Sequence, residues 1–214
     1  MLISSRRVVT ALALASGLAA MFPVAAPVAA SADDKTLAQA LRAGGLVIVI
    51  RHGATFPDQA DTDPLHPDNV KAQRHLNDSG KAAAKALGEA LRAIGVPVGK
   101  VYTSRFQRAY DTAALAGLKD IEKTADITEG GLVVSPDENN RRAKAFRQLV
   151  GTAPAAGTNT VLVSHKPNII DALGKDWFDV KEGEASIFKP DAGKYQLLAR
   201  LQMADWSKIA TPEH

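Results

Sequence analysis

Residues 46–53 read LVIVIRHG, a run of aliphatic residues that ends abruptly in arginine, histidine and glycine. An uninterrupted apolar run rich in β-branched residues is typical of a strand covered on both faces, as in a parallel sheet between helices. Polar groups at the carboxyl end of such a strand lie at the edge where α/β proteins place their functional sites. The stretch therefore predicts a buried strand that delivers Arg51 and His52 to that edge.

Strand-like and helix-like segments alternate along the rest of the chain. A second buried-strand pattern, TVLV at 160–163, is followed by Ser164 and His165. Apolar periodicity and turn residues predict further strands near 100–103, 132–134, 185–189 and 195–201, and helices near 35–43, 79–94, 106–116, 138–150 and 168–173. This alternation predicts an α/β fold, a three-layer sandwich with a mostly parallel sheet flanked by helices. We see neither a repeat nor a linker within 33–214, so we expect a single domain there.

The first 32 residues have the layout of a secretory signal peptide. Arg6 and Arg7 precede an uncharged apolar run from Val8 to Phe22, and a Pro/Ala-rich stretch ends in Ala-Ser-Ala at 30–32. The apolar run is shorter than the ~20 residues of a membrane-spanning helix. We therefore expect the signal peptide to be removed after Sec or twin-arginine export, which gives a periplasmic or secreted protein without stable membrane insertion.

Composition excludes several classes of protein. The chain contains no cysteine, which rules out disulfide frameworks, thiolate metal centres and a cysteine nucleophile. Its formal net charge is +3, and Arg6 and Arg7 account for two of these charges. The remainder of the chain is therefore nearly neutral, and we expect no nucleic-acid partner.

Histidine and arginine residues follow three of the predicted strands. His52 and His165 each come directly after a buried strand, and Arg51 adjoins the first histidine. Arg105 and Arg108 share one face of the first turn of the helix that follows the strand near 100–103. Because carboxyl ends of parallel strands meet at one edge, we expect these groups to converge into an oxyanion site suited to a phosphoryl group.

These residue types predict a particular chemistry. Arginine holds two phosphate oxygens with its planar fork and stays charged at any working pH. A neutral imidazole can attack phosphorus, and neighbouring arginines keep its pKa low. A second histidine can stabilise the charge that spreads over the transition state. Such a scheme requires neither a metal nor a cofactor.

Three motifs occur in a fixed order, each at a predicted strand end. They are Arg51-His52-Gly53, Ser104-x-x-x-Arg108-Ala109-x-x-Thr112-Ala113 and Leu162-Val163-Ser164-His165. In this order they resemble the signatures of the histidine phosphatase superfamily, which includes phosphoglycerate mutases and many phosphomonoesterases. The resemblance covers residues 46–201 and implies a phosphoglycerate mutase-like fold. Gln73-Arg74-x-Leu76 and Gly183-Glu184-Ala185 are similar to the small exported bacterial branch of that superfamily.

The resemblance implies a role for each matching residue. His52 would be the phosphorylated nucleophile. Arg51, Arg108 and His165 would form the phosphate pocket around it. Thr55 would add a hydroxyl donor to the phosphate.

The remaining assignments are open at the level of sequence. Arg105 replaces the proline that is common in the superfamily, which puts a third arginine near the mouth of the pocket. The general acid that protonates the leaving group requires a carboxyl group near the phosphate. Glu184 and Glu138 are the two main candidates, and we favour Glu184. Asp137 and an aspartate of the 54–78 segment are further candidates.

The segment 54–78 is polar and too long for an ordinary connection, which favours a lid or a substrate-side loop. It is rich in acidic residues and histidine, namely Asp58, Asp61, Asp63, His66 and Asp68. Their spacing matches no standard metal-binding loop, so we expect no metal there.

The sequence therefore favours a metal-independent phosphatase that hydrolyses phosphomonoesters through a phosphohistidine at His52. Its substrate would be a phosphorylated small molecule, glycan or protein. A phosphohistidine-protein phosphatase is one alternative. A non-catalytic protein that binds phosphate or glycan phosphate on the same fold is another.

Overall fold

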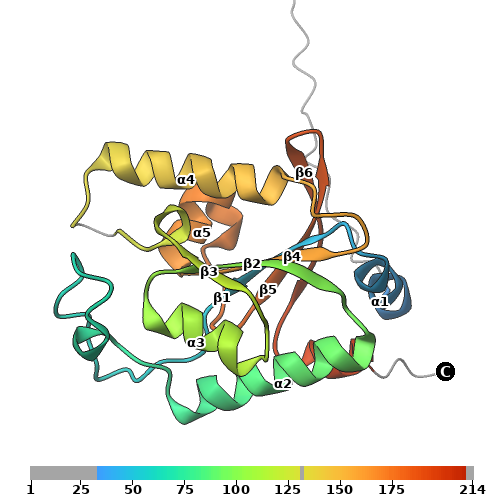
Figure 1. Cartoon of the computed structure of the whole chain (residues 1–214), viewed down its shortest axis with the longest axis horizontal. Helices are drawn as coiled ribbons and strands as arrows, with labels where there is room; N and C mark the ends of the chain where they lie inside the picture. Colours follow the sequence, from blue (N-terminus) through green and yellow to red (C-terminus); the bar gives the residue numbers. More distant parts are fainter. Residues whose placement is uncertain (1–32, 131–132, 211–214) are drawn as a thin grey trace, which may run out of the picture.

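The computed structural model describes residues 33–130 and 133–210 and shows a six-stranded sheet between two layers of helices (Figure 1). The strand order is β3-β2-β4-β1-β5-β6. The strands are β1 (Val47–Arg51), β2 (Val98–Ser104), β3 (Ile121–Thr124), β4 (Asn159–Ser164), β5 (Ala185–Asp191) and β6 (Lys194–Leu201). The pairs within β3-β2-β4-β1 are parallel, whereas β5 joins β1 and β6 in antiparallel fashion. The predicted α/β fold with a mostly parallel, helix-flanked sheet is confirmed.

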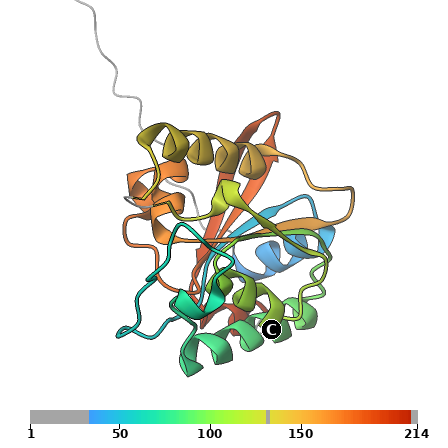
Figure 2. The ribbon, with the colours of Figure 1, turned by 60° about the vertical axis from the view of Figure 1, so that its left-hand side comes forward.

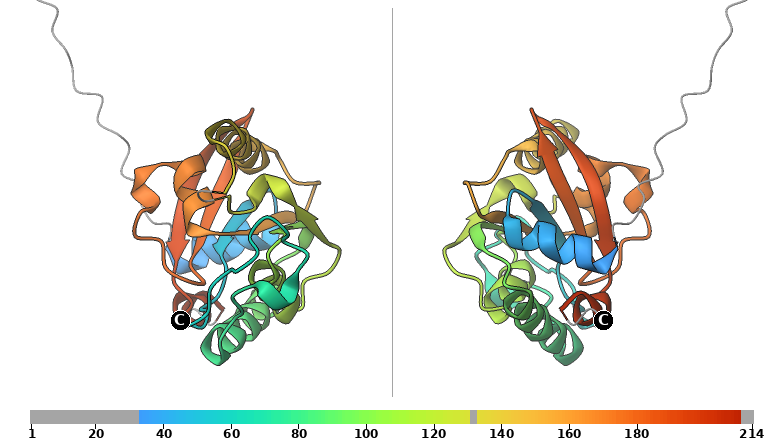
Figure 3. Two further views of the ribbon diagram at one scale, coloured as in Figure 1. Left: turned by 90° about the vertical axis from the view of Figure 1, so that its left-hand side faces the viewer. Right: turned by 90° about the vertical axis from the view of Figure 1, so that its right-hand side faces the viewer.

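Helices cover both faces of this sheet. They are α1 (Asp34–Ala43), α2 (Asp78–Ile94), α3 (Gln107–Leu115), α4 (Pro136–Gly151), α5 (Lys166–Leu173) and α6 (Asp205–Ala210). Apolar residues of α1, α2, α3 and α6 share one core cluster, and those of α4 and α5 share the other. Figure 3 shows the sheet nearly edge-on, with α4 on one side and α2 on the other.

The alternation of side chains along β1 explains why residues 46–50 are continuously apolar. Ile48 and Ile50 point into the cluster under α2, whereas Val47 and Val49 point into the cluster under α4. All four are at most 1% exposed. A strand buried on both faces has no polar position, so the pattern that predicted this strand is a direct consequence of the two helical layers.

The segment 54–78 runs from β1 to α2 and contains one short 3₁₀ turn, η1 (Val70–Ala72). Figure 2 shows it in teal, extending as a long loop beside the helical layer of α2. It returns to the core at Asn77, whose side chain accepts a 2.8 Å hydrogen bond from Gly80 N and begins α2. Gly80 packs so close to the backbone of Ala54 that a Cβ atom would lie 2.1 Å from the Ala54 oxygen. The glycine therefore brings the start of α2 against the loop that follows His52.

One predicted strand is wrong. Val133 and Val134 lie in a turn and a bend, and residues 131–132 are outside the described residues. The fourth parallel strand is β3, which sequence reasoning missed. β3 is a short edge strand without a fully buried residue, so it lacks the apolar signal of a central strand.

Residues 1–32, which carry the predicted signal peptide, lie outside the described residues. Within the described ranges, no helix combines the length and apolar character needed to cross a bilayer.

Candidate active site

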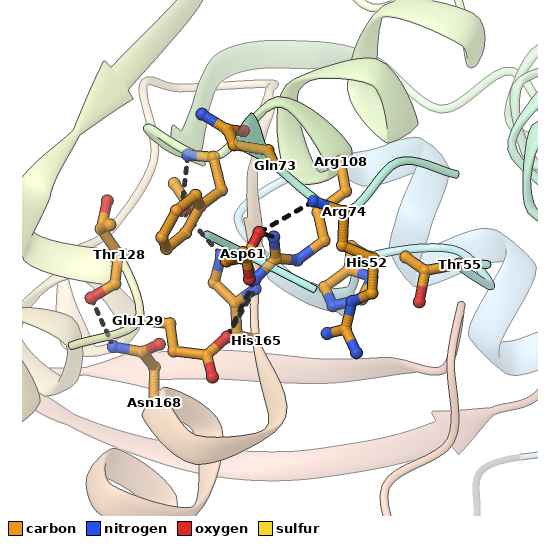
Figure 4. Close-up of polar contacts among 12 residues, drawn as sticks. His52, Thr55, Asp61, Gln73, Arg74, Arg108, Thr128, Glu129, His165 and Asn168 are labelled. Carbon is orange, nitrogen blue, oxygen red and sulfur yellow. Dashed lines mark hydrogen bonds and ion pairs between the residues drawn. The ribbon is translucent and has the colours of Figure 1, made fainter. Parts of the chain in front are cut away.

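The ends of β1, β2 and β4 bring the predicted site residues together at one edge of the sheet. Arg51 ends β1 opposite Ser164, which ends β4. The His52 backbone N–H donates a 3.0 Å hydrogen bond to the Ser164 carbonyl, which continues the pairing one residue further. The His52 and His165 rings consequently lie with their centroids 5.1 Å apart. Figure 4 shows both rings beside Arg108, which comes from the first turn of α3.

His52 has the features of a nitrogen nucleophile. His52 is buried, with 2% of its surface exposed, and its Nδ1 atom is 2.8 Å from the Gly53 carbonyl oxygen. Because a carbonyl oxygen only accepts hydrogen bonds, Nδ1 carries the proton and Nε2 keeps its lone pair. Burial, followed by the charge of Arg108, lowers the pKa of His52 from 6.5 to about 3. His52 is therefore neutral over the whole physiological pH range.

Arg108 provides a fully buried cation. Its side chain is 0% exposed, and its guanidinium lies 4.5 Å from the centroid of the Phe106 ring. One terminal nitrogen donates to Asp61 at 2.9 Å and the other to Glu129 at 3.1 Å. Both carboxylates are partly exposed, which makes them replaceable partners for this charge.

Arg51 is held by the loop that precedes β5. It donates a 2.8 Å hydrogen bond to the Val180 carbonyl and lies 3.4 Å from the Glu182 carboxylate. The backbone N–H of Gly183 contacts the carbonyl oxygens of Arg51 and His52 at 3.0 Å each. Burial lowers the pKa of Arg51, and nearby Glu182 opposes this effect. The loop before β5 therefore fixes both the guanidinium of Arg51 and the backbone of the nucleophile.

His165 completes the pocket from the end of β4. It is 0% exposed, and its Nε2 atom lies 2.7 Å from the Ser104 hydroxyl oxygen. Its Nδ1 atom lies 3.3 Å from the Glu129 carboxylate without hydrogen-bond geometry. Burial and the charge of Arg108 hold the pKa of His165 well below 6.5, so this ring is also neutral.

The structure places neither Glu184 nor Glu138, the two main candidates for the general acid, among the histidines and arginines of the pocket. Glu184 is 1% exposed, and its carboxylate pairs with Arg200 at 2.6 Å and accepts hydrogen bonds from Gln202 and the Lys181 backbone. Arg200 comes from β6, Gln202 directly follows that strand, and Lys181 lies in the loop before β5. The spacing of Glu184 after the second histidine indicated the correct edge of the sheet, but its side chain is turned toward Arg200.

Glu138 also has other partners. It lies in the first turn of α4, where its carboxylate pairs with Arg141 and Arg142 at 2.7 Å each. The hydrogen bonds from these arginines lower the pKa of Glu138 to about 2. A carboxyl group that stays ionised at such low pH is a poor proton donor. Asp137 lies in the same turn of α4 and is exposed.

The two auxiliary residues of the predicted pocket occupy its margins. Thr55 is 7% exposed, and its hydroxyl lies 3.5 Å from Glu182. Figure 4 shows Thr55 on the His52 side of the group. The Arg105 guanidinium pairs with Asp68 of the 54–78 segment, and 38% of its side chain is exposed. Arg105 therefore ties that segment to the start of α3.

Three residues of the site were not assigned by sequence reasoning. Glu129 contacts both Arg108 and His165, and Asp61 contacts Arg108. Arg74 lies in the same group in Figure 4, where its positive charge further lowers the pKa of His52 and of His165. Glu129 follows β3 and the 3₁₀ turn η2 (Ala125–Ile127). Because the sequence pattern does not predict β3, it does not place Glu129 at the functional edge of the sheet.

The 54–78 segment is attached to the pocket at several points. The Asp61 carboxylate accepts from the Arg74 backbone N–H at 2.9 Å as well as from Arg108. The Gln73 side chain accepts from the Gln107 backbone N–H at 2.7 Å. His66 contacts Asp63 at 2.6 Å, and the described residues contain no cluster of three or more histidines and carboxylates suited to a metal.

Known proteins share this sequence pattern and fold. The model of the histidine phosphatase superfamily (branch 1) matches residues 47–134, which include His52 and Arg108. Over 67 residues the chain is 39% identical to the mitochondrial serine/threonine-protein phosphatase Pgam5 of Drosophila virilis. That match covers 31% of this chain and only 20% of the Pgam5 chain. The matched segment therefore spans about a fifth of the length of that relative.

Solved structures extend the similarity to about three quarters of the chain. The protein histidine phosphatase SixA in complex with tungstate has a TM-score of 0.56 and 18% identity, with 75% of this chain and 98% of that chain covered. A putative alpha-ribazole-5'-P phosphatase of Escherichia coli has a TM-score of 0.51 and 18% identity, with 72% and 94% covered. The solved structures thus share the fold of this chain, and the family model matches the part of it that carries His52 and Arg108.

Proposed function

We propose that this protein is a phosphatase that hydrolyses phosphomonoesters through a phosphohistidine intermediate at His52. The observation that carries this proposal is a buried, neutral histidine whose free Nε2 atom faces a pocket with a buried arginine. A nitrogen lone pair attacks phosphorus only when it is unprotonated, and burial together with the charge of Arg108 keeps His52 in that form. The match to the histidine phosphatase family model supports the same conclusion.

The reaction has two steps. First, the Nε2 lone pair of His52 forms a bond to phosphorus, the ester P–O bond breaks, and the leaving oxygen takes a proton from a carboxyl group. Arg51, Arg108 and His165 stabilise the negative charge on the phosphoryl oxygens. Second, water attacks phosphorus and gives a proton back to the carboxylate. The P–N bond breaks, its electron pair returns to Nε2, and phosphate leaves.

We assign the general acid to Glu129, which is ionised and paired with Arg108 in the free protein and takes up a proton when the phosphoryl group replaces it at that arginine. It lies within 3.3 Å of both His165 and Arg108, which places it beside the two side chains that hold the phosphoryl group. It is partly exposed, so it has access to water for the second step. Asp61 contacts Arg108 alone, and its second hydrogen bond holds the Arg74 backbone.

The reaction is tested by hydrolysis of an aryl phosphate in excess chelator with wild-type protein and His52→Ala. We expect chelator-resistant turnover that His52→Ala abolishes. Intact mass after an alkaline denaturing quench should show one added phosphoryl group on the wild type only. His66→Ala is the control, because His66 is exposed and its ring contacts Asp63, which is not one of the pocket residues. Phosphate binding without turnover would instead indicate a non-catalytic binding protein.

We also propose that the protein is exported. This rests on the charged start, apolar run and small-residue stretch of residues 1–32. Expression of the full chain with a C-terminal tag in a bacterial host tests it. Export predicts a periplasmic product whose N-terminus, determined by mass spectrometry, lies near Ser31 or Asp33. An uncleaved cytoplasmic product contradicts the proposal. In either location we expect a phosphorylated small molecule, glycan or protein as substrate.

A further inference from the structure

Ser104 ends β2 and contacts the ring of His165. Its hydroxyl oxygen accepts a 3.1 Å hydrogen bond from the Phe106 backbone N–H and lies 2.7 Å from His165 Nε2. Both Ser104 and His165 are 0% exposed. Water therefore has no access to the ring nitrogen or the hydroxyl, and the two groups must satisfy each other.

Two arrangements of the hydrogen atoms are possible between these groups. If Nε2 carried the proton, the Ser104 oxygen would accept from both Phe106 and His165, and its own hydroxyl proton would have no acceptor in a fully buried site. If Ser104 donates to Nε2, the Phe106 N–H, the Ser104 hydroxyl and Nε2 are all paired, and the remaining Nδ1–H lies 3.3 Å from the Glu129 carboxylate. A buried hydroxyl proton without an acceptor is less favourable than an N–H beside a carboxylate, which selects the second arrangement.

Glu129 favours the same arrangement from the opposite end of the ring. Its carboxylate oxygen lies 3.3 Å from His165 Nδ1. A lone pair on Nδ1 would face this negative charge and be repelled, whereas a proton on Nδ1 is attracted to it. Ser104 and Glu129 thus both place the proton of a neutral His165 on Nδ1.

We propose that Ser104 is a positioning residue that holds His165 as its Nδ1–H tautomer, so that the neutral ring presents a hydrogen-bond donor to the phosphoryl group. The role in catalysis rests on the phosphatase function proposed above. The tautomer itself does not, because it follows from contacts within the free protein.

The two pocket histidines then share one tautomer but expose opposite ends of their rings. His52 donates its Nδ1 proton to the Gly53 carbonyl and keeps a free lone pair on Nε2. His165 accepts at Nε2 from Ser104 and keeps a free N–H at Nδ1. One ring is prepared to attack phosphorus, and the other is prepared to bind the oxygens that surround it. A proton shift on His165 would turn a lone pair toward those oxygens and oppose binding.

The first test is ¹⁵N NMR of the imidazole nitrogens in the unliganded full-length protein, with His165→Asn for assignment. One-bond and two-bond proton couplings show which nitrogen carries hydrogen. We expect His165 with hydrogen on Nδ1 and a bare, hydrogen-bonded Nε2. Hydrogen on Nε2 in the wild type overturns the proposal, whether or not the protein proves to be a phosphatase.

Variants test the part played by Ser104. In Ser104→Ala we expect an increase in the Nε2–H form, and a fall in kcat with a smaller change in KM; the fall should be at most the roughly 10²- to 10³-fold that loss of one oriented donor costs, because the ring itself remains. Ser104→Thr retains the hydroxyl and should restore both. Unchanged tautomer and kcat in Ser104→Ala would show that Ser104 does not position the ring.

Ser186→Ala is the matched control. Ser186 is 2% exposed on β5, and its hydroxyl accepts a 2.8 Å hydrogen bond from Trp177. This substitution also removes one buried hydroxyl from the sheet, but it does so away from the histidines. We expect a loss of stability without a change of tautomer or of kcat. An equal loss of kcat in the control would attribute the Ser104→Ala effect to general destabilisation and overturn the positioning role.

Discussion

Arg108 and Glu184 lie in two ion-pair clusters of opposite construction. In the pocket, the arginine is fully buried, and its partners Asp61 and Glu129 have 21% and 28% of their side chains exposed. In the cluster before β5, the carboxylate of Glu184 is 1% exposed, and 26% of its partner Arg200 is exposed. A buried cation with exposed, replaceable anions is suited to receive an anionic ligand. A buried anion held by three donors is suited to fix a loop.

This difference bears on Glu184, the residue that the sequence favours as the general acid and that stays a prediction. Its loop does serve the pocket, because the Glu184 carbonyl accepts from Arg51 N and Gly183 N contacts the His52 carbonyl. Its carboxylate, however, is already neutralised by Arg200. The position of Glu184 in the sequence therefore indicates a loop that lies beside the pocket. Its ion pair with Arg200 indicates that the carboxylate holds this loop in place.

The largest contrast should come from the two arginines. Arg108→Gln removes the buried pocket cation, and we expect kcat/KM for an aryl phosphate to fall by at least ~10³-fold. Arg200→Gln should lower the free energy of unfolding and leave kcat/KM of the folded protein within about threefold. Steady-state kinetics and urea unfolding of both variants measure this contrast. Equal losses of turnover in the two variants would contradict the assignment of Arg108 to the phosphate pocket and of Arg200 to the cluster that holds the loop before β5.

The carboxylates should differ in a similar way. Glu129→Gln removes the proposed proton donor, and we expect an alkyl phosphate to lose about 10²- to 10⁴-fold in kcat. A nitrophenyl phosphate should lose far less, because its leaving group needs little protonation. Turnover of both substrates is compared in Glu129→Gln and in Glu138→Gln, whose carboxylate is engaged on α4. Equal losses on the two substrates would argue against an acid role for Glu129.

Glu184→Ala should act on stability. It removes the buried carboxylate that holds Arg200, Gln202 and the Lys181 backbone N–H together. We expect the free energy of unfolding to fall by about 2 kcal/mol, as for the loss of several hydrogen bonds to a buried charged group. Urea unfolding monitored by circular dichroism measures it. A stable Glu184→Ala protein with a large, selective loss of alkyl phosphate turnover would restore Glu184 as the acid.

Stability should also depend on pH through the pocket histidines. An unfolded His52 binds a proton below its usual pKa of 6.5, whereas the folded one does so only near pH 3. The unfolded state therefore binds more protons between these values, and the free energy of unfolding falls as the pH decreases through this window. His52→Asn should make this decrease shallower by up to about 1.4 kcal/mol per pH unit. Identical slopes in urea unfolding at pH 6.5, 5.5 and 4.5 would contradict it.

The smallest effect concerns Asp61. Phosphate that approaches Arg108 competes with this carboxylate, so Asp61→Asn should bind inorganic phosphate about two- to fivefold more tightly, as expected for loss of one partly exposed ion pair. Isothermal titration calorimetry at pH 7 measures the change. Weaker binding would show that Asp61 supports the pocket through Arg74 more than it blocks it.

Sequence reasoning located the strand-end residues well because their signal is local. An apolar run covered on both faces identifies a central strand, and the residue after it must lie at the sheet edge. This applies to Arg51, His52 and His165, and the first turn of α3 adds Arg108. The edge strand β3 has no such apolar run, so neither this strand nor the position of Glu129 after it can be predicted from the sequence.

The sequence by itself determined the α/β fold and which side chains meet at its functional edge, because buried strands restrict composition at every position and parallel pairing aligns their ends. Only the tertiary structure decided which carboxylate faces the pocket and which tautomer each histidine adopts. Glu129, Glu138 and Glu184 are the same residue type, and the sequence alone does not distinguish them. Their different environments are set by the arginines with which each one pairs in the folded protein. The Ser104 hydroxyl and the Gly53 carbonyl assign the imidazole protons in the same way. Such partners are distant in the chain or set by backbone geometry, and no local pattern encodes them.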